Sequence, residues 1–306
     1  MAAMKRFGLV NGLAHRSPDP VANFHLTGKI LYVTMLLLNW SNPVHVRGSR
    51  LTKTIAVAGK GGTGKTTISA LIIDHLVRNK KGSVLAIDAD PSTNLNLALG
   101  VPLHDTVGDV REETATAIGG RGALGGMSKW DYLDFRINES LVEESGFDLL
   151  AMGRPEGPGC YCAANNILRT SVDRLSDAYD YVVIDNEAGL EHLSRRTTRD
   201  VDLLFLVSDP TLRGIVAAGR VVEVVDELKT SVGAIHLIIN RVNGDTLPEP
   251  LMKAIAEHRL RLAGFIPADP AVNELDAQGQ PIVKLPEDAP ARRSLEAILA
   301  SSDECL

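Results

Sequence analysis

The sequence predicts an α/β fold in which a mostly parallel β-sheet is flanked by helices on both faces. Short apolar runs alternate with helical stretches from Lys53 onward, which is the pattern of consecutive β-α-β units. Only 4% of the residues are aromatic, whereas Val, Ile, Leu, Ala and Gly are abundant, as is typical of buried parallel sheets. With 306 residues and 44% hydrophobic content, the chain can bury the core of one large domain.

The expected elements follow from the periodicity of the apolar residues. Strands are expected at residues 54–58, 84–88, 147–152, 181–185, 203–207, 234–240 and 260–266. Helices are expected at residues 66–78, 163–176, 212–229, 249–258 and 291–299. The glycine-rich stretch 119–126 is expected to be a loop. Ligands of such sheets bind at the carboxyl ends of the strands, so residues that follow a strand are the first candidates for function.

The charge of the chain is unevenly distributed. Residues 1–50 contain six Lys or Arg and one Asp, a balance of +5, so the net charge of −6 leaves −11 for residues 51–306. An acidic domain argues against a nucleic-acid surface. We expect residues 1–50 to be an extension, either disordered or the result of a start codon assigned too early, and residues 51–306 to form the folded domain. The apolar stretch 30–40 is shorter than the ~18–20 residues of a membrane span, although a membrane-associating segment remains an alternative.

A phosphate-binding loop follows the first expected strand. The run Gly59-Lys60-Gly61-Gly62-Thr63-Gly64-Lys65-Thr66-Thr67 fits the spacing G-x-x-x-x-G-K-[ST]. In this pattern, glycines let backbone N–H groups surround phosphate oxygens, and the lysine neutralises their charge. Thr66 is expected to offer its hydroxyl to Mg²⁺, and the helix that follows directs its positive end at the nucleotide. The sequence therefore predicts a nucleotide site, and Lys60 adds a second lysine that ordinary loops of this type lack.

Three aspartates follow the ends of two expected strands and are candidates for nucleotide chemistry. Asp88 and Asp90 close the second strand, where a carboxylate can position the attacking water and respond to the γ-phosphate. The alternative is that both serve as turn and helix-cap residues. Asp185 ends another strand and is the expected carboxylate on the Mg²⁺ side, direct or through water. The run 187–192 after it is the expected switch, in which His192 is either a hydrogen-bonded switch residue or a metal ligand.

The identity of the base is predicted from the run Asn240-Arg241-Val242-Asn243 after a strand. Guanine-reading proteins place an aspartate three residues beyond the asparagine, because a carboxylate accepts from guanine N1–H and from its amino group. Asn243 is less suited to this, whereas an amide suits adenine. ATP is therefore favoured over GTP. Pro267, after the last strand, either helps to frame the base or is an ordinary loop proline.

These residues resemble the SIMIBI branch of P-loop NTPases, the deviant Walker A ATPases that include the MinD/ParA, arsenite-pump ATPase and nitrogenase iron-protein families. The resemblance rests on Lys60 within the loop, on Asp88-Ala89-Asp90, and on Asp185 followed by Ala188-Gly189. It implies ATP hydrolysis that depends on Lys60, Lys65 and Asp90. It also implies an ATP-dependent homodimer, in which the lysine matching Lys60 reaches the nucleotide of the partner.

Two cysteines set this chain apart, in Gly157-Pro158-Gly159-Cys160-Tyr161-Cys162. A helix is expected directly after them, and its N-terminus lowers the pKa of a thiol and favours the metal-binding thiolate. Two thiolates cannot complete a four-ligand site, but a two-fold dimer supplies two more. Such an S₄ site favours zinc or an iron–sulfur cluster when tetrahedral and suits nickel when planar. Buried structural cysteines or a redox dithiol are the alternatives.

The cysteine run ahead of residues 165–169, together with residues 185–192, resembles the CooC family of ATPases. These proteins assist nickel insertion into carbon monoxide dehydrogenase, and a sister family serves the nickel cluster of acetyl-CoA synthase. The resemblance implies Ni²⁺ or Zn²⁺ held by Cys160 and Cys162 across a homodimer, with one of these two enzymes as client. Residues 1–50 have no counterpart in the family.

Two other functions remain open. The first is a spatial regulator of the MinD/ParA type, which predicts a basic amphipathic membrane helix at the C-terminus or a basic DNA-binding face. The acidic end of the chain, residues 301–306, and the charge of −11 support neither. The second is an iron–sulfur reductase, in which the bridging cysteines lie on separate loops. Three cysteines in 306 residues fit a reducing, cytoplasmic location.

Overall fold

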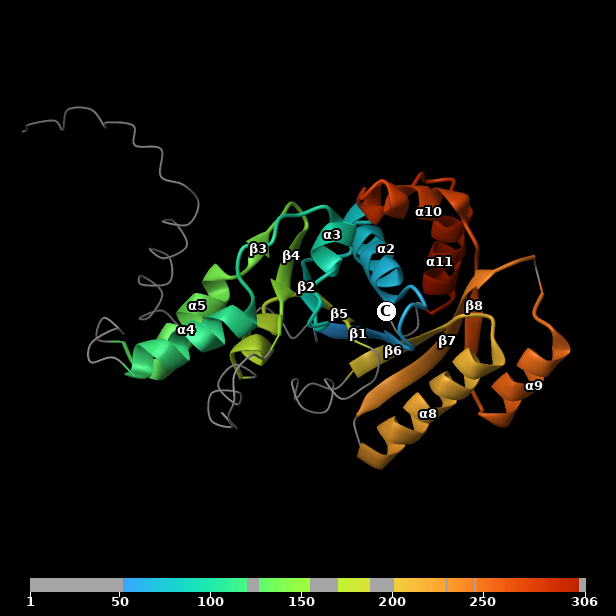
Figure 1. The fold of residues 1–306 in the computed structure, drawn as a ribbon, viewed down its shortest axis with the longest axis horizontal. Helices are drawn as coiled ribbons and strands as arrows, with labels where there is room; N and C mark the ends of the chain where they lie inside the picture. Colours follow the sequence, from blue (N-terminus) through green and yellow to red (C-terminus); the bar gives the residue numbers. More distant parts are fainter. Residues whose placement is uncertain are drawn as a thin grey trace, which may run out of the picture. The chain divides into compact units, whose positions relative to one another are not determined.

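An eight-stranded sheet runs through the described part of the chain (Figure 1). The structure is a computed structural model, and it describes residues 52–119, 127–154, 170–187, 201–228, 231–244 and 246–302. All of these residues belong to one unit, residues 50–306. The strands are β1 (Lys53–Gly59), β2 (Val84–Asp88), β3 (Val142–Glu143), β4 (Phe147–Ala151), β5 (Tyr181–Asp185), β6 (Val201–Ser208), β7 (Val232–Val242) and β8 (Leu262–Pro267). The extension predicted for residues 1–50 lies outside the described residues.

The order of the strands in the sheet is β3-β4-β2-β5-β1-β6-β7-β8. Neighbouring strands are parallel throughout, except that β3 pairs with β4 in the antiparallel sense. The strands with continuous apolar runs, such as β2, are buried along their whole length, as expected for a sheet that is covered on both faces. The predicted fold class is therefore confirmed.

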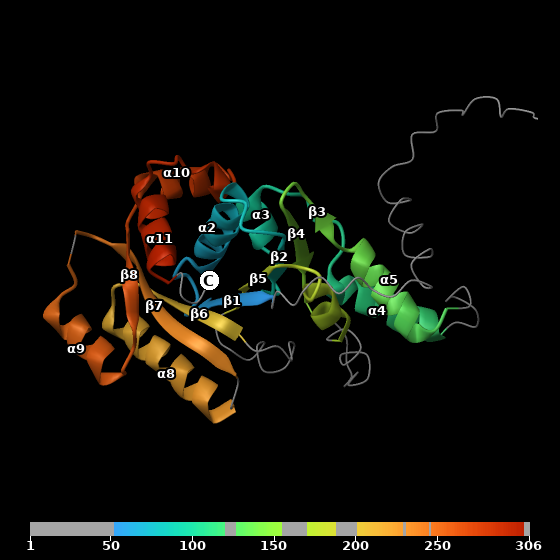
Figure 2. The same ribbon diagram turned by 180° about the vertical axis from the view of Figure 1, so that it is seen from behind.

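Helices cover the two faces of this sheet. They are α2 (Lys65–Arg78), α3 (Leu95–Leu99), α4 (Val107–Gly119), α5 (Lys129–Glu139), α8 (Leu212–Leu228), α9 (Glu249–Glu257), α10 (Pro270–Ala277), the 3₁₀ helix η2 (Ile282–Lys284) and α11 (Pro290–Ser301). Figures 1 and 2 both show α2, α3, α10 and α11 on one face and α8 and α9 on the other. Residues 170–176 are also helical and form the described end of the predicted helix 163–176.

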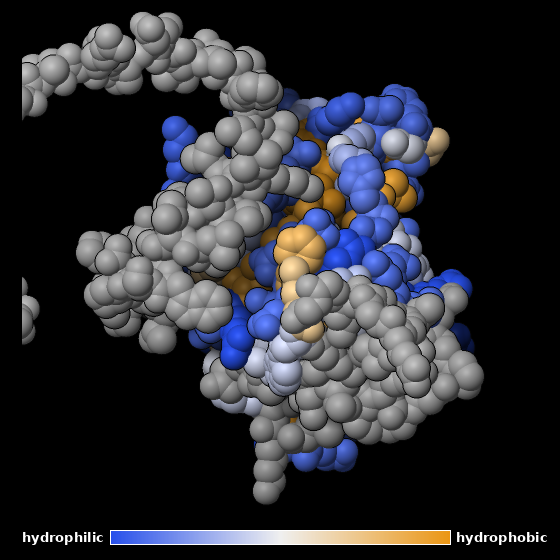
Figure 3. Space-filling model, turned by 90° about the vertical axis from the view of Figure 1, so that its left-hand side faces the viewer, coloured by the Kyte–Doolittle hydropathy of each residue, from blue (hydrophilic) through white to orange (hydrophobic). Residues whose placement is uncertain are grey.

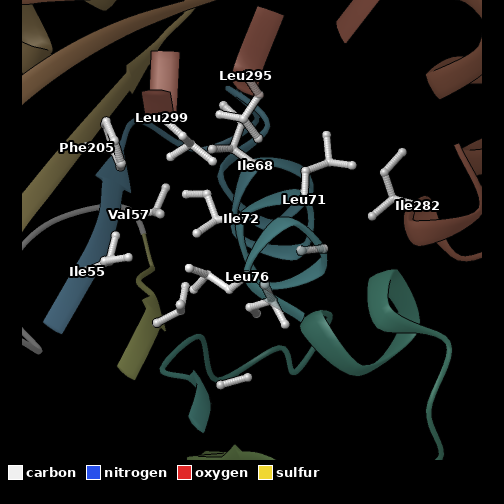
Figure 4. Close-up of a cluster of buried hydrophobic side chains, with 14 of the residues drawn as sticks. Ile55, Val57, Ile68, Leu71, Ile72, Leu76, Phe205, Ile282, Leu295 and Leu299 are labelled. Atoms are coloured by element: carbon white, nitrogen blue, oxygen red, sulfur yellow. The ribbon is translucent and has the colours of Figure 1, made fainter. Parts of the chain in front are cut away.

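Helix α2 is central to one of the two cores. Its apolar residues recur every three or four positions, so Ile68, Leu71, Ile72 and Leu76 share the face that packs against the sheet. Figure 4 shows them between strand residues on one side and α11 and η2 on the other. Each fully buried side chain of this kind contributes about 1.5–3 kcal/mol, so the packing fixes the position of the helix that follows the phosphate-binding loop.

Several elements were not among those predicted. They are β3, α3, α4, α5, α10 and η2. In addition, Gly119, which was expected in a loop, is the last residue of α4. The strand β3 has two residues and α3 has five, which is too short for a periodic signal. Val110 of α4 and Leu133 and Ile137 of α5 are buried in the same core, and Arg136 of α5 bonds Glu113 of α4 at 2.6 Å. Their stability therefore depends on tertiary contacts, which local patterns do not show.

Hydrophobic residues are mostly inside this unit. Figure 3 shows mainly hydrophilic residues on the described part of one face, with smaller hydrophobic areas between them. The large hydrophobic side chains that are exposed in the described part are Leu97, Met127, Trp130, Phe135, Leu212, Val224 and Met252. Among the described residues, none of the helices has the length and apolar character needed to cross a membrane.

Candidate functional site

The phosphate-binding loop lies between the carboxyl end of β1 and the start of α2, at the middle of the sheet. Backbone geometry at two positions requires glycine. Gly59 has φ 149° and lies so close to β6 that a Cβ atom there would collide with the carbonyl oxygen of Val207. Gly64 has φ 94°, and its Cβ would collide with the amide nitrogen of Asn240. The glycines therefore let two neighbouring strands close tightly around the loop.

The carbonyl oxygen of Lys60 organises the loop from within. It accepts hydrogen bonds from Thr63 Oγ1 at 2.9 Å, from Thr63 N at 3.4 Å and from Lys65 Nζ at 3.4 Å. The two lysines differ in their surroundings, because the side chain of Lys65 is buried whereas that of Lys60 is exposed. One lysine thus lies inside the loop, and the other is available to a group outside it.

Lys65 lies among carboxylates. Burial lowers the pKa of its ammonium group, and the negative charges of Asp185, Asp90 and Glu187 oppose that effect. The structure thus brings together Lys65, Asp90 and Asp185, which the sequence had placed at the ends of three different strands. A buried ammonium group on a loop with open space at Gly62 is suited to an anion such as a phosphate.

Asp185 is held by two hydroxyl groups of α2. Ser69 Oγ donates to Asp185 Oδ1 at 2.9 Å, and the side chain of Thr66 also donates to this carboxylate. Burial raises the pKa of Asp185 to about 6, while the bonds from Thr66 and Ser69 and the charge of Lys65 counteract the rise. Hard cations prefer oxygen donors, and here a carboxylate and a hydroxyl group lie together at the end of the phosphate-binding loop.

Asp88 and Asp90 have different environments. Asp88 is buried, and both of its oxygens accept backbone N–H groups, Oδ1 from Asp90 at 3.0 Å and Oδ2 from Leu95 at 2.9 Å. Burial raises the pKa of Asp88 to about 7, although these two bonds oppose the rise. Asp88 thereby links the end of β2 to the backbone of Asp90 and to the start of α3. Asp90 is only partly buried, and its Oδ1 accepts from Ser92 N at 2.8 Å.

The carboxyl end of β7 contacts the phosphate-binding loop. Asn240 Nδ2 donates to the carbonyl oxygen of Thr63 at 2.8 Å, and its Oδ1 accepts from Arg241 N at 2.9 Å. Arg241 has a left-handed φ of 59°, and its guanidinium donates to Gly62 O at 3.0 Å. The structure therefore directs Asn240 and Arg241 at the carbonyl groups of the loop, and Asn243 is exposed.

Pro267 ends β8 beside Val242, and the next residue, Ala268, donates its backbone N–H to Val242 O at 3.0 Å. Asp269 then fixes this turn. Its Oδ1 accepts from Ala271 N and its Oδ2 from Ala291 N, each at 3.0 Å, so one buried carboxylate caps the starts of α10 and α11. The position of Pro267 is therefore set from both the sheet and the helices.

Two residues of the site were not singled out in the sequence. Ser69 contacts Asp185, and Asn186 Nδ2 donates to Val57 O at 3.1 Å, which ties the segment after β5 to β1. A polar residue on the buried face of an apolar helix, one turn after Thr66, was the available signal for Ser69. Nothing comparable marked Asn186, because its partner is a backbone group on another strand.

Three predicted residues lie outside the described residues: Cys160, Cys162 and His192. Within the described ranges, no group of three or more His, Cys, Asp or Glu side chains is placed to hold a metal ion.

The residues at the loop fit a nucleotide with Mg²⁺. Lys65 supplies a cation for phosphate oxygens, and Gly62 leaves space where a side chain would stand. Thr66 and Asp185 supply the hydroxyl and carboxylate oxygens that Mg²⁺ prefers. The donor set and its position at the start of α2 match the requirements of nucleotide phosphates.

Known proteins resemble this chain over most of its length. An uncharacterized ATP-binding protein of Methanocaldococcus jannaschii is 43% identical over 80% of this chain and 96% of its own length. The carbon monoxide dehydrogenase accessory protein CooC of Rhodospirillum rubrum is 32% identical over 74% of this chain and 87% of its own. The solved structure of the septum site-determining protein MinD with Mg-ADP from Pyrococcus horikoshii has a TM-score of 0.60 at 21% identity, covering 83% of this chain and 97% of that one.

The family described as the CobQ/CobB/MinD/ParA nucleotide binding domain matches residues 54–282. This match begins in β1 and ends in η2, so it includes the phosphate-binding loop and the carboxylates around it. The chain therefore belongs to the CobQ/CobB/MinD/ParA nucleotide-binding family.

Proposed function

We propose that this protein is an ATP-hydrolysing metallochaperone that assists nickel insertion into carbon monoxide dehydrogenase. The observation that supports its ATP-dependent homodimer is the contrast between the two loop lysines, one buried among carboxylates and one exposed. An exposed lysine on a phosphate-binding loop is suited to the nucleotide of a second copy. The 32% identity to CooC over 87% of that protein supports the nickel-related role.

Each residue of the loop has a distinct role in this proposal. The N–H groups of residues 59–67 and the ammonium of Lys65 bind the phosphates of ATP. Thr66 and Asp185 hold Mg²⁺, which neutralises phosphate charge when bound. Asp90 orients the attacking water, since its carboxylate is partly exposed and lies near Lys65. ATP is preferred over GTP because Asn243 lacks the carboxylate that guanine requires.

The metal is cargo in this proposal. Closure of the homodimer brings Cys160 and Cys162 of one protomer together with the same residues of the other. Four thiolates then bind one nickel or zinc ion, and hydrolysis opens the dimer and permits transfer to the client. The cysteine thiols must lose their protons to bind the metal as thiolates, so metal affinity is expected to fall in acid.

Dimerisation is tested by analytical ultracentrifugation with MgATP. The wild type should sediment as a dimer, whereas Lys60→Ala should remain a monomer while still binding ATP. Lys253→Ala is the matched control, because Lys253 is 76% exposed and its ion pair with Glu257 lies at the surface. A Lys60→Ala protein that dimerises like the wild type would contradict the proposed role of Lys60.

The client is identified by activating nickel-free enzyme with NiCl₂, ATP and this protein. Faster activation of carbon monoxide dehydrogenase, lost in the Cys160→Ala, Cys162→Ala variant, is the expected result. Activation of acetyl-CoA synthase alone would assign the protein to the sister function. Dimerisation without activation of either enzyme would favour a spatial regulator of the MinD/ParA type.

A further inference from the structure

Ser69 stands out among the buried hydroxyl groups of the described helices. It is fully buried on the apolar face of α2, beside Ile68 and Ile72. A buried hydroxyl group inside a helix commonly bonds the carbonyl group four residues earlier. Thr114 does so with Val110 O at 2.7 Å, and Ser176 does so with Val172 O at 2.7 Å.

Ser69 donates instead to Asp185 Oδ1, 116 residues away in sequence, at 2.9 Å. The carboxylate of Asp185 is 1% exposed, and Thr66, one turn before Ser69, donates to the same group. Two hydroxyl groups on one face of one helix therefore hold a single carboxylate. Because α2 is itself packed between the sheet, α11 and η2, both hydroxyl groups have fixed positions.

We propose that Ser69 is a positioning residue, which holds the carboxylate of Asp185 toward Thr66 so that both oxygen donors face Mg²⁺ together. Without this bond, Asp185 keeps its place at the end of β5, but only the hydrogen bond from Thr66 still orients its carboxylate. The side-chain entropy lost when the carboxylate is ordered then opposes metal binding, while the backbone of the phosphate-binding loop is unaffected. The inference rests on the proposed binding of MgATP.

The test measures the affinity for ADP by isothermal titration calorimetry, in EDTA and over a series of MgCl₂ concentrations. For Ser69→Ala, the Mg²⁺ concentration that gives half of the gain in affinity should rise about tenfold, the loss that corresponds to one buried hydrogen bond. The affinity for ADP in EDTA should stay within about twofold of the wild type. Ser69→Thr, which keeps the hydroxyl group, should restore most of the Mg²⁺ response.

Ser176→Ala is the matched control, since it removes a buried serine hydroxyl whose bond, within the described residues, is to Val172 of its own helix. It should leave the Mg²⁺ response unchanged. If Ser69→Ala does not fold, Ser69→Cys replaces it, and its weaker donor should give a smaller shift in the same direction.

An unchanged Mg²⁺ response in Ser69→Ala would overturn the inference and leave the proposed function intact. Equal losses of ADP affinity in EDTA and in Mg²⁺ would also overturn it, because they indicate a structural role for Ser69. A wild type whose ADP affinity does not respond to Mg²⁺ would overturn the inference and the proposed function together.

Discussion

The two lysines of the phosphate-binding loop have different surroundings. The ammonium of Lys65 is buried among Asp185, Asp90 and Glu187, which keep a positive charge available for phosphate, whereas that of Lys60 is exposed. Both lysines were identified in the sequence from the spacing of the loop. Their burial was not, because it depends on carboxylates from other strands.

The first prediction concerns Lys65→Ala. Removing the buried ammonium leaves the developing phosphate charge without its cation, so ATP hydrolysis should fall by at least about 10²-fold. Phosphate release in a steady-state assay measures the effect. Lys253→Ala, at an exposed surface position, should keep the wild-type rate. Hydrolysis by Lys65→Ala within a few-fold of the wild type would contradict the assignment.

Asp90 provides the second prediction. Its carboxylate lies near Lys65 and bonds only Ser92 N among the interactions found in the described residues. Asp90→Ala should keep ATP affinity and lose turnover, as judged by calorimetry and phosphate release on the same preparation. Asp276→Ala, on the exposed surface of α10, is the control. Normal turnover in Asp90→Ala would remove Asp90 from catalysis and leave it as a turn residue.

At the scale of elements, the loop is held from the outside by the end of β7. Asn240 bonds Thr63 O, and Arg241 bonds Gly62 O, so two consecutive residues fix two consecutive carbonyl groups. The N–H groups of the loop are thereby kept available for a ligand. Asn240 was proposed in the sequence as part of the base site, and the structure adds its contact with the loop.

The third prediction follows from this contact. Asn240→Ala removes a buried hydrogen bond that costs about 1–2 kcal/mol, which corresponds to about five- to thirtyfold weaker nucleotide affinity. Titration of ATP by calorimetry measures the change. Asn273→Ala is the matched control, since it removes an exposed asparagine side chain on α10. Equal effects of the two substitutions would show that the contact with Thr63 is unimportant.

The sequence predicted some elements well and others not at all, for a physical reason. The strands next to the loop are continuous apolar runs, and α2 has a strong apolar periodicity, so local patterns were sufficient. The helices α4 and α5 depend on Arg136 and its acidic partners from both helices. Similarly, Asp269 caps α10 and α11 at once, and only the fold brings Ala291 to it.

At the scale of the whole molecule, His236 links the sheet to the end of α11. It is 3% exposed in β7, its ring lies 6.2 Å from that of Phe205, and its Nδ1 lies 3.3 Å from Ser302 Oγ. Burial lowers the pKa of His236, and the positive charge of Arg261 lowers it further. The folded protein therefore favours the neutral imidazole of His236 more strongly than the unfolded chain does.

The fourth prediction concerns stability against pH. Since the unfolded chain takes up a proton near its ordinary pKa of about 6.5, the contribution of His236 is complete above that pH and is lost progressively below it. His236→Leu should lose less stability than the wild type between about pH 7.5 and about pH 5.5, by urea unfolding. His104→Leu, at an exposed histidine, should follow the wild type. An identical pH dependence in His236→Leu would refute this role.

In the proposed function, a nucleotide-dependent homodimer carries a metal ion on paired cysteines. Native mass spectrometry with metal analysis tests this most directly, on the wild type and on the Cys160→Ala, Cys162→Ala variant, with and without MgATP. We expect one nickel or zinc ion per wild-type dimer with nucleotide, and none in a variant that still binds ATP. A wild type that dimerises with ATP but binds no metal, or a variant that keeps its metal, would contradict the proposed metal site.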